Sequence, residues 1–81
     1  MAESSHWRMQ LNNLLQRSYG TRVLTWQTEQ IGPQHVAPWV ATALVNGVNY
    51  GSGQAHTQGE AKEQAARVAY YGLMDELSRR R

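Results

Sequence analysis

The 81-residue sequence contains no cysteine, which excludes disulfide bonds, thiolate zinc sites and a cysteine nucleophile. No apolar run approaches the length of about 20 residues that a membrane-spanning helix needs, and we expect no membrane partner. The first residues contain no basic segment followed by an apolar one, so no signal peptide is apparent. The lack of cysteine fits a reducing compartment, and we expect an intracellular protein, in the cytoplasm or the nucleus.

Catalytic and metal-binding patterns are also lacking. The three histidines, His6, His35 and His56, do not follow the spacing of metal ligands. Scattered acidic side chains are expected at the surface, where the helical ones can pair with nearby arginines; they are Glu29, Glu60, Glu63, Asp75 and Glu76. We therefore predict that the protein is not an enzyme and that it holds no metal or other cofactor.

Positively charged side chains are in small excess over negatively charged ones. Eight lysine and arginine residues against six aspartate and glutamate residues give a net charge of +2, and the sequence pI is near 9.4. This balance is compatible with a polyanionic partner but is too small to demand one. Three of the eight basic residues form the run 79–81. That run can be a solvated tail, a charge cluster at a helix C-terminus, or part of a longer basic segment.

The first part of the chain predicts a helix followed by a strand. The helix is expected over about residues 5–17, because apolar residues recur there at helical spacing; they are Trp7, Leu11, Leu14 and Leu15. Tyr19 and Gly20 end it, with Gly20 as the left-handed residue that helix ends favour. Residues 23–29 are rich in β-branched and aromatic side chains and predict a strand.

Two further strands are joined by a tight turn. Residues 39–45 alternate, with Trp39, Ala41, Ala43 and Val45 on one side and Val40, Thr42 and Leu44 on the other. The dipeptide Asn46-Gly47 favours a type I′ turn, which needs positive φ at both positions. Residues 48–53 then predict the third strand, antiparallel to the second.

A second helix is expected over about residues 57–78. Thr57 can act as its N-cap, and Glu60 can complete a capping box by reaching back to the Thr57 amide. Small residues recur at Ala61, Ala65 and Ala69, which indicates close packing on a flat surface, with Lys62 on the flank away from that face. Unpaired amides at a helix N-terminus suit a phosphate, although an ordinary capped helix that covers a sheet explains the same pattern.

These elements predict one α+β domain over residues 1–81, with its core at about 5–77 and a basic tail at 79–81. A three-stranded antiparallel sheet would carry both helices on one face, because each helix has a single apolar side. The aromatic residues could stack on bases of a single strand, but the pattern assigns Trp26 and Trp39 to the core or its edge. The positions of Trp7 and Tyr71 stay open.

Several of these segments together resemble the double-stranded-RNA-binding domain family. The resemblance is carried by Leu11-Asn12-Asn13 in the first helix, by Gly32-Pro33-Gln34-His35, by Gly51-Ser52-Gly53, and by Ala61-Lys62 in the second helix. The family shows a leucine-asparagine-glutamate core, a Gly-Pro-x-His loop, a Gly-x-Gly strand end, and a helix that opens Ser-Lys-Lys-x-Ala-Lys. The resemblance covers about residues 5–77 and implies binding of double-stranded RNA by its shape.

The resemblance implies three groups of RNA contacts. The candidate RNA-binding residues are Gln10, Asn13, Gly32, Pro33, His35, Gln58, Gly59 and Lys62. The stiff Gly-Pro turn would present His35 to ribose 2′-hydroxyls, and the amides of Gln10 and Asn13 suit a shallow minor groove. The start of the second helix, with Lys62 and the candidate His56, would meet phosphates. Each of these assignments has an alternative without RNA contact. His35 can be a loop histidine without a role, and Gln10 and Asn13 can belong to a solvated polar stripe.

This sequence departs from the family pattern at the start of the second helix. Gln58 and Gly59 stand where the family usually has two lysines, and Asn13 stands where it usually has glutamate. We see no compensating cluster of cations, because Arg67 lies more than one helical turn beyond Lys62, and we therefore predict weakened RNA binding.

The alternative function is a protein-interaction or homodimerisation domain of the same fold. It would use the apolar side chains of Val40 and Leu44 on the side of the sheet away from the helices, or the edge of the third strand.

Overall fold

The computed structural model describes residues 6–18, 20, 23–32 and 38–79 of the chain. Its elements follow one another as α1 (Trp7–Ser18), β1 (Leu24–Gln30), β2 (Trp39–Val45), β3 (Val48–Ala55) and α2 (Gln58–Arg79). The predicted order of helix, three strands and helix is confirmed. No helix among the described residues has the length and apolar character needed to cross a membrane.

The three strands form one antiparallel sheet in the order β1-β2-β3. Leu24 pairs with Val45 at one end of the β1–β2 ladder, and Gln30 pairs with Trp39 at the other. The turn between β2 and β3 has positive φ at both positions, 53° at Asn46 and 80° at Gly47, as the type I′ prediction requires. The register between β2 and β3 shifts at Ala43/Leu44.

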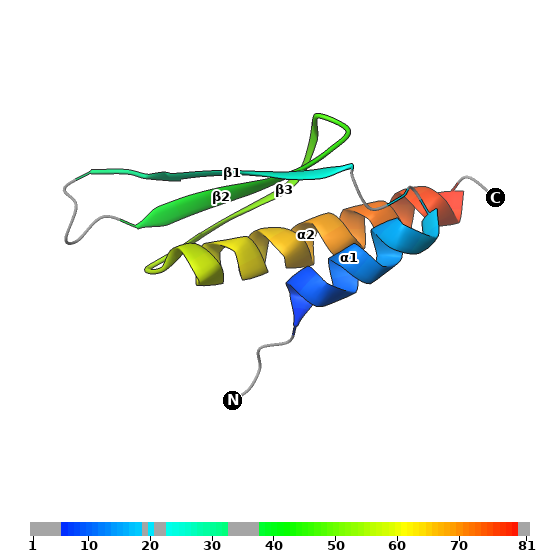
Figure 1. The fold of residues 1–81 in the computed structure, drawn as a ribbon, viewed down its shortest axis with the longest axis horizontal. Coiled ribbons are helices and arrows are strands. Elements are labelled where there is room, and N and C mark those ends of the chain that lie inside the picture. Colours follow the sequence, from blue (N-terminus) through cyan, green and yellow to red (C-terminus); the bar gives the residue numbers. More distant parts are fainter. Residues whose placement is uncertain (1–5, 19, 21–22, 33–37, 80–81) are drawn as a thin grey trace.

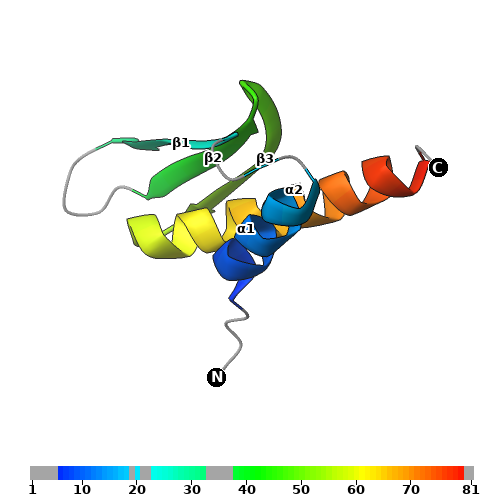
Figure 2. The same cartoon turned by 45° about the vertical axis from the view of Figure 1, so that its right-hand side comes forward.

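Both helices cover the same face of the sheet and run side by side (Figure 1, Figure 2). The alternation of β2 sets this arrangement: Ala41, Ala43 and Val45 are buried, while Val40 and its alternate neighbours are only partly buried. α1 ends as predicted, because Gly20 has a φ of 104° and its amide donates to the Leu15 carbonyl at 2.7 Å.

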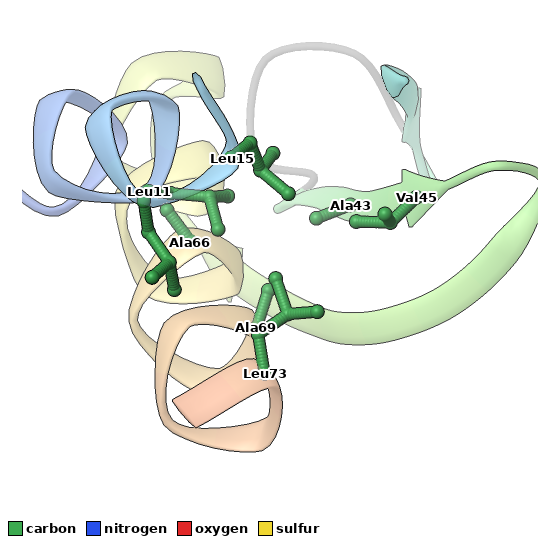
Figure 3. Close-up of a cluster of buried hydrophobic side chains, with 8 residues drawn as sticks. Leu11, Leu15, Ala43, Val45, Ala66, Ala69 and Leu73 are labelled. Carbon is green, nitrogen blue, oxygen red and sulfur yellow. The ribbon is translucent and has the colours of Figure 1, made fainter. Parts of the chain in front are cut away.

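The main core lies between the two helices and β2. Figure 3 shows leucines of α1, small residues of α2 and the buried side of β2 converging on one another. The cluster comprises Leu11, Leu14, Leu15, Ala43, Val45, Ala66, Ala69 and Leu73. Apart from the leucines these are small side chains, so the helices lie close to the sheet and their positions are closely determined by it.

Two glycines of β3 allow α2 to lie directly on the sheet. A Cβ atom added at Gly51 would stand 2.6 Å from both the Ala65 carbonyl oxygen and the Ala69 nitrogen. One added at Gly53 would stand 2.7 Å from the Ala61 carbonyl oxygen. The predicted close packing of the small-residue face of this helix is therefore confirmed, and its flat partner is β3.

The tryptophans lie at the edges of this packing. A second, smaller group of buried residues consists of Ala41, Ala61 and Ala65. Trp26 packs against the main core and against this group, and Trp39 packs against this group, but both tryptophans are only partly buried. We predicted that these two tryptophans lie in the core or at its edge, and the structure places them at its edge. Trp7 of α1 contacts the rings of Tyr70 and Tyr71 of α2, with centroids 5.6 and 5.3 Å away, while Tyr71 itself remains 55% exposed.

Candidate nucleic-acid interface

The start of α2 is capped as predicted. The Glu60 amide donates to the Thr57 hydroxyl oxygen at 3.1 Å, and the Ala61 amide donates to the Thr57 carbonyl at 3.0 Å. The reciprocal hydrogen bond, in which the Thr57 amide would donate to the Glu60 carboxylate, stays a prediction. In any helix the first amides have no partner within the helix itself, so this exposed first turn offers donors and a partial positive charge to an anion.

Lys62 lies beside this first turn and faces β1. Its ammonium nitrogen is 5.8 Å from the centroid of the Trp26 ring, a distance at which the ring attracts a cation. Lys62 is only partly buried, whereas the small-residue face formed by Ala61, Ala65 and Ala69 is fully buried.

Gln58 connects the same turn to the sheet. Its side-chain amide nitrogen donates to the Thr28 hydroxyl oxygen of β1 at 3.1 Å. The first turn of α2 is therefore held from the strand side by Gln58 and Lys62, and it lies at the end of the sheet where β1 ends and β2 begins (Figure 1). Its exposed polar groups consequently have a defined direction.

Gly59 faces α1 rather than the sheet. Among the described residues beyond its chain neighbours, a Cβ atom at this position would come nearest to the guanidinium of Arg8, with Nη2 at 4.0 Å. Arg8 is itself tied to α2, because its backbone amide donates to the Glu63 carboxylate oxygen Oε1 at 3.0 Å and its Nε lies 3.9 Å from the same oxygen. Sequence reasoning missed Arg8, because only the packing of α1 on α2 brings it to this turn.

The α1 candidates lie on another side of that helix. Gln10 and Asn13 line one shallow open depression together with Gln16, Arg17 and Tyr70. Gln10 is partly buried and Asn13 is exposed. The two amide side chains therefore lie close together, and Arg17 adds a cation to the same depression.

The loop between β1 and β2 is described only at its ends. Gly32 is exposed, with a φ of 94° that favours glycine, and the Ile31 amide donates to the Pro38 carbonyl at 3.1 Å. Pro33 and His35 lie outside the described residues, and their RNA contacts stay predictions. His56, the further phosphate candidate, is exposed immediately before α2. Among the described residues, no group of three or more histidine, aspartate or glutamate side chains could hold a metal ion.

Comparison with known proteins agrees with this arrangement. Residues 7–73 match the family model described as the double-stranded RNA binding motif. The chain is 34% identical over 67 residues to "Ribonuclease 3" of Streptomyces coelicolor, covering 83% of this chain and 24% of that protein. It is 30% identical over 76 residues to "Ribonuclease 3" of Nocardia farcinica, covering 94% of this chain and 31% of that protein.

The chain therefore spans about a quarter to a third of the length of these relatives. The family match, in contrast, runs from the first residue of α1 into the last turns of α2 and includes the whole sheet. On the strength of that match, the chain belongs to the double-stranded RNA binding motif family.

Proposed function

We propose that this domain binds double-stranded RNA by its shape and does so without catalysis. The observation that carries the proposal is the capped first turn of α2, with Lys62 beside it, in a chain of the double-stranded RNA binding motif family. The two longer relatives are named as ribonucleases, and we assign to this chain only the binding of duplex RNA.

The mode of binding follows from the form of an RNA duplex. Its minor groove is wide and shallow and displays 2′-hydroxyls, whereas its major groove is deep, narrow and flanked by phosphates. Gln10 and Asn13 of α1 suit one minor groove, and His35 of the β1–β2 loop would serve the next. The start of α2 would then meet phosphates across the intervening major groove, so the domain would recognise the form of the duplex rather than its bases.

The affinity is expected to be modest. Gln58 and Gly59 carry no charge, so the number of phosphates that α2 neutralises is small, and each neutralised phosphate contributes about one unit to the salt dependence of binding. We therefore expect weak binding with a shallow decrease as the salt concentration rises.

Titration of a perfect RNA duplex at several salt concentrations tests the proposal, with a DNA duplex of the same sequence as the comparison. Binding of RNA that is stronger than binding of DNA and that weakens with salt would support it. The Lys62→Ala variant should bind more weakly and lower the salt slope by about one unit. Absence of RNA binding at low salt by a correctly folded domain would contradict the proposal.

The His35 contact can be tested in the same titration. His35→Ala should weaken RNA binding and reduce the preference for RNA over DNA, because it removes contacts with 2′-hydroxyls, which DNA lacks. An unchanged preference would leave the loop histidine without this role.

A second candidate function is association with a protein, in particular with another copy of this chain. It is favoured by Val40 and Leu44, which alternate with the buried residues of β2 and lie on the face of the sheet away from the helices. If that face forms the interface of a homodimer, Val40→Lys should lower the molecular mass of the particle in solution with little loss of stability. A wild-type domain that is monomeric at high concentration would exclude the homodimer.

A further inference from the structure

We propose that Arg8 of α1 contributes a backbone-phosphate contact next to Lys62, and that Gly59 leaves the space in which its guanidinium meets the first turn of α2. The inference rests on the proposed function, since it adds a residue to the same RNA-binding surface. It is carried by the position of Arg8, which comes from the other helix and from a part of the sequence that none of the RNA-binding patterns includes.

The guanidinium of Arg8 lies beside Gly59. A side chain at residue 59 would begin 4.0 Å from Nη2 of Arg8, the nearest atom among the described residues apart from the chain neighbours and the local helix backbone. The missing side chain of Gly59 therefore leaves the exposed side of the first turn open to Arg8. Gly59 and Lys62 are three positions apart and lie on neighbouring parts of the helix surface, so Arg8 of α1 and Lys62 of α2 both lie beside the first turn of α2.

Glu63 orients Arg8 without consuming its hydrogen-bonding capacity. The carboxylate oxygen Oε1 accepts its hydrogen bond from the backbone amide of Arg8 at 3.0 Å. The side-chain Nε of Arg8 is 3.9 Å from the same oxygen, which is too long for a hydrogen bond. The Nε edge of the guanidinium thus lies toward Glu63, while Nη2 lies toward Gly59.

The exposure and chemistry of Arg8 suit a phosphate. Its side chain is 46% exposed, so a large polyanion can reach it. The planar guanidinium presents several donors in a fixed arrangement that matches phosphate oxygens, which makes arginine a better partner for phosphate than its charge alone would suggest. Arg8 therefore supplies a charge that Gln58 and Gly59 do not.

The Arg8→Gln variant provides a direct test because it separates binding from folding. The hydrogen bond that holds the start of α1 on α2 comes from the backbone of Arg8 and does not require its side chain, so the thermal midpoint should change little. The affinity for a perfect RNA duplex at low salt should fall about threefold to tenfold, and the salt slope should decrease by about one unit.

Arg67→Gln is the matched control. It removes the same charge from an exposed position of α2, but its side chain lines a groove with Ser52, Val68 and Tyr71 on the side toward β3. If Arg8→Gln and Arg67→Gln weaken binding equally, only net charge matters and the inference fails. If wild-type protein does not bind RNA at low salt, the proposed function itself fails, which is a different result.

A lysine introduced at residue 59 tests whether this position and Arg8 share one space beside the first turn of α2. Gly59→Lys should tighten RNA binding more in the Arg8→Gln background than in the wild type, because in the wild type the new ammonium would compete with the guanidinium of Arg8 for one place. Equal gains in the two backgrounds would show that residues 8 and 59 act independently and would overturn the inference.

Discussion

Gly51 and Gly59 both face a helix, yet their surroundings differ in kind. At Gly51 in β3, an added Cβ would stand 2.6 Å from two backbone atoms of α2, so the absence of a side chain permits the contact between helix and sheet. At Gly59 in α2, the nearest atom to an added Cβ, in the part of the chain that the structure describes, is the end of the Arg8 side chain at 4.0 Å. One glycine is required by packing, whereas the other leaves space on an exposed surface.

The difference separates the two tasks of α2. Its middle residues serve the fold, because Ala61, Ala65 and Ala69 lie against β3 and the core with no exposed surface. Its first turn is held by the Thr57 cap and the Gln58–Thr28 hydrogen bond, but it remains open to a partner. Substitutions in the middle of the helix should therefore change stability, and substitutions in its first turn should change binding.

The largest effect is expected from Gly51→Ala. Both atoms that the new Cβ would approach belong to the backbone of α2, so relief requires the helix to move away from the sheet. We expect a loss of about 3 kcal/mol in the free energy of unfolding, at the upper end of the usual cost of overpacking, in a domain whose total is about 4–12 kcal/mol. Chemical denaturation measures it, and a loss below about 1 kcal/mol would show that α2 can shift freely on β3.

Trp39→Ala should follow closely. Trp39 packs against the smaller group of buried residues that Ala41, Ala61 and Ala65 form, but its ring is only partly buried. We expect a loss of about 2–3 kcal/mol, below the 3–5 kcal/mol or so of a fully buried aromatic residue. A thermal melt that barely changes would show that the ring contributes little to the contact between sheet and helix.

Most of the fold could be predicted from the sequence because its signals are local. The alternation of β2, the Asn46-Gly47 turn and the Thr57 cap each depend on residues that are neighbours along the chain, and each is confirmed. The small residues of α2 indicated a flat partner for the same reason. Partial burial of Trp39 was not foreseeable, because alternation gives the side of a strand and not the distance from the edge of the core.

The candidate site was predicted less completely because part of it depends on contacts between distant residues. Arg8 and Glu63 are 55 positions apart, and no pattern in either helix indicates that they meet. The position of Lys62 over Trp26 likewise depends on how α2 crosses the sheet. Family resemblance supplied the candidates Gln58, Gly59 and Lys62, whereas Arg8 came only from the packing of the two helices.

Adding charge to the first turn should produce an intermediate effect, seen in binding rather than in stability. The double variant Gln58→Lys, Gly59→Lys should bind duplex RNA about tenfold more tightly at low salt, and the gain should decrease as salt rises because the new contacts would be with phosphates. A lysine at residue 58 can still donate a hydrogen bond to the Thr28 hydroxyl in place of Gln58, and Gly59 has space for a Cβ. A variant that folds normally and gains no affinity would indicate that this turn does not face RNA, and the protein-binding alternative would then be favoured.

The smallest effect, and the sharpest contrast with Gly51, is expected from Gly59→Ala. Alanine forms helices more readily than glycine by about 0.5–1 kcal/mol, and the added Cβ would make no contact closer than 4.0 Å. The free energy of unfolding should therefore be higher in the variant than in the wild type by up to that amount. The gain should be smaller than in the middle of a helix, because residue 59 lies in the first turn. Chemical denaturation of Gly59→Ala and Gly51→Ala side by side should give changes of opposite sign in the free energy of unfolding.

Because a methyl group is smaller than the gap to the Arg8 guanidinium, the RNA affinity of Gly59→Ala should stay within about twofold of the wild type. A destabilised Gly59→Ala protein would mean that the methyl group disturbs the packing of Arg8 beside α2, and the distinction between a glycine that permits packing and one that leaves space would then not hold.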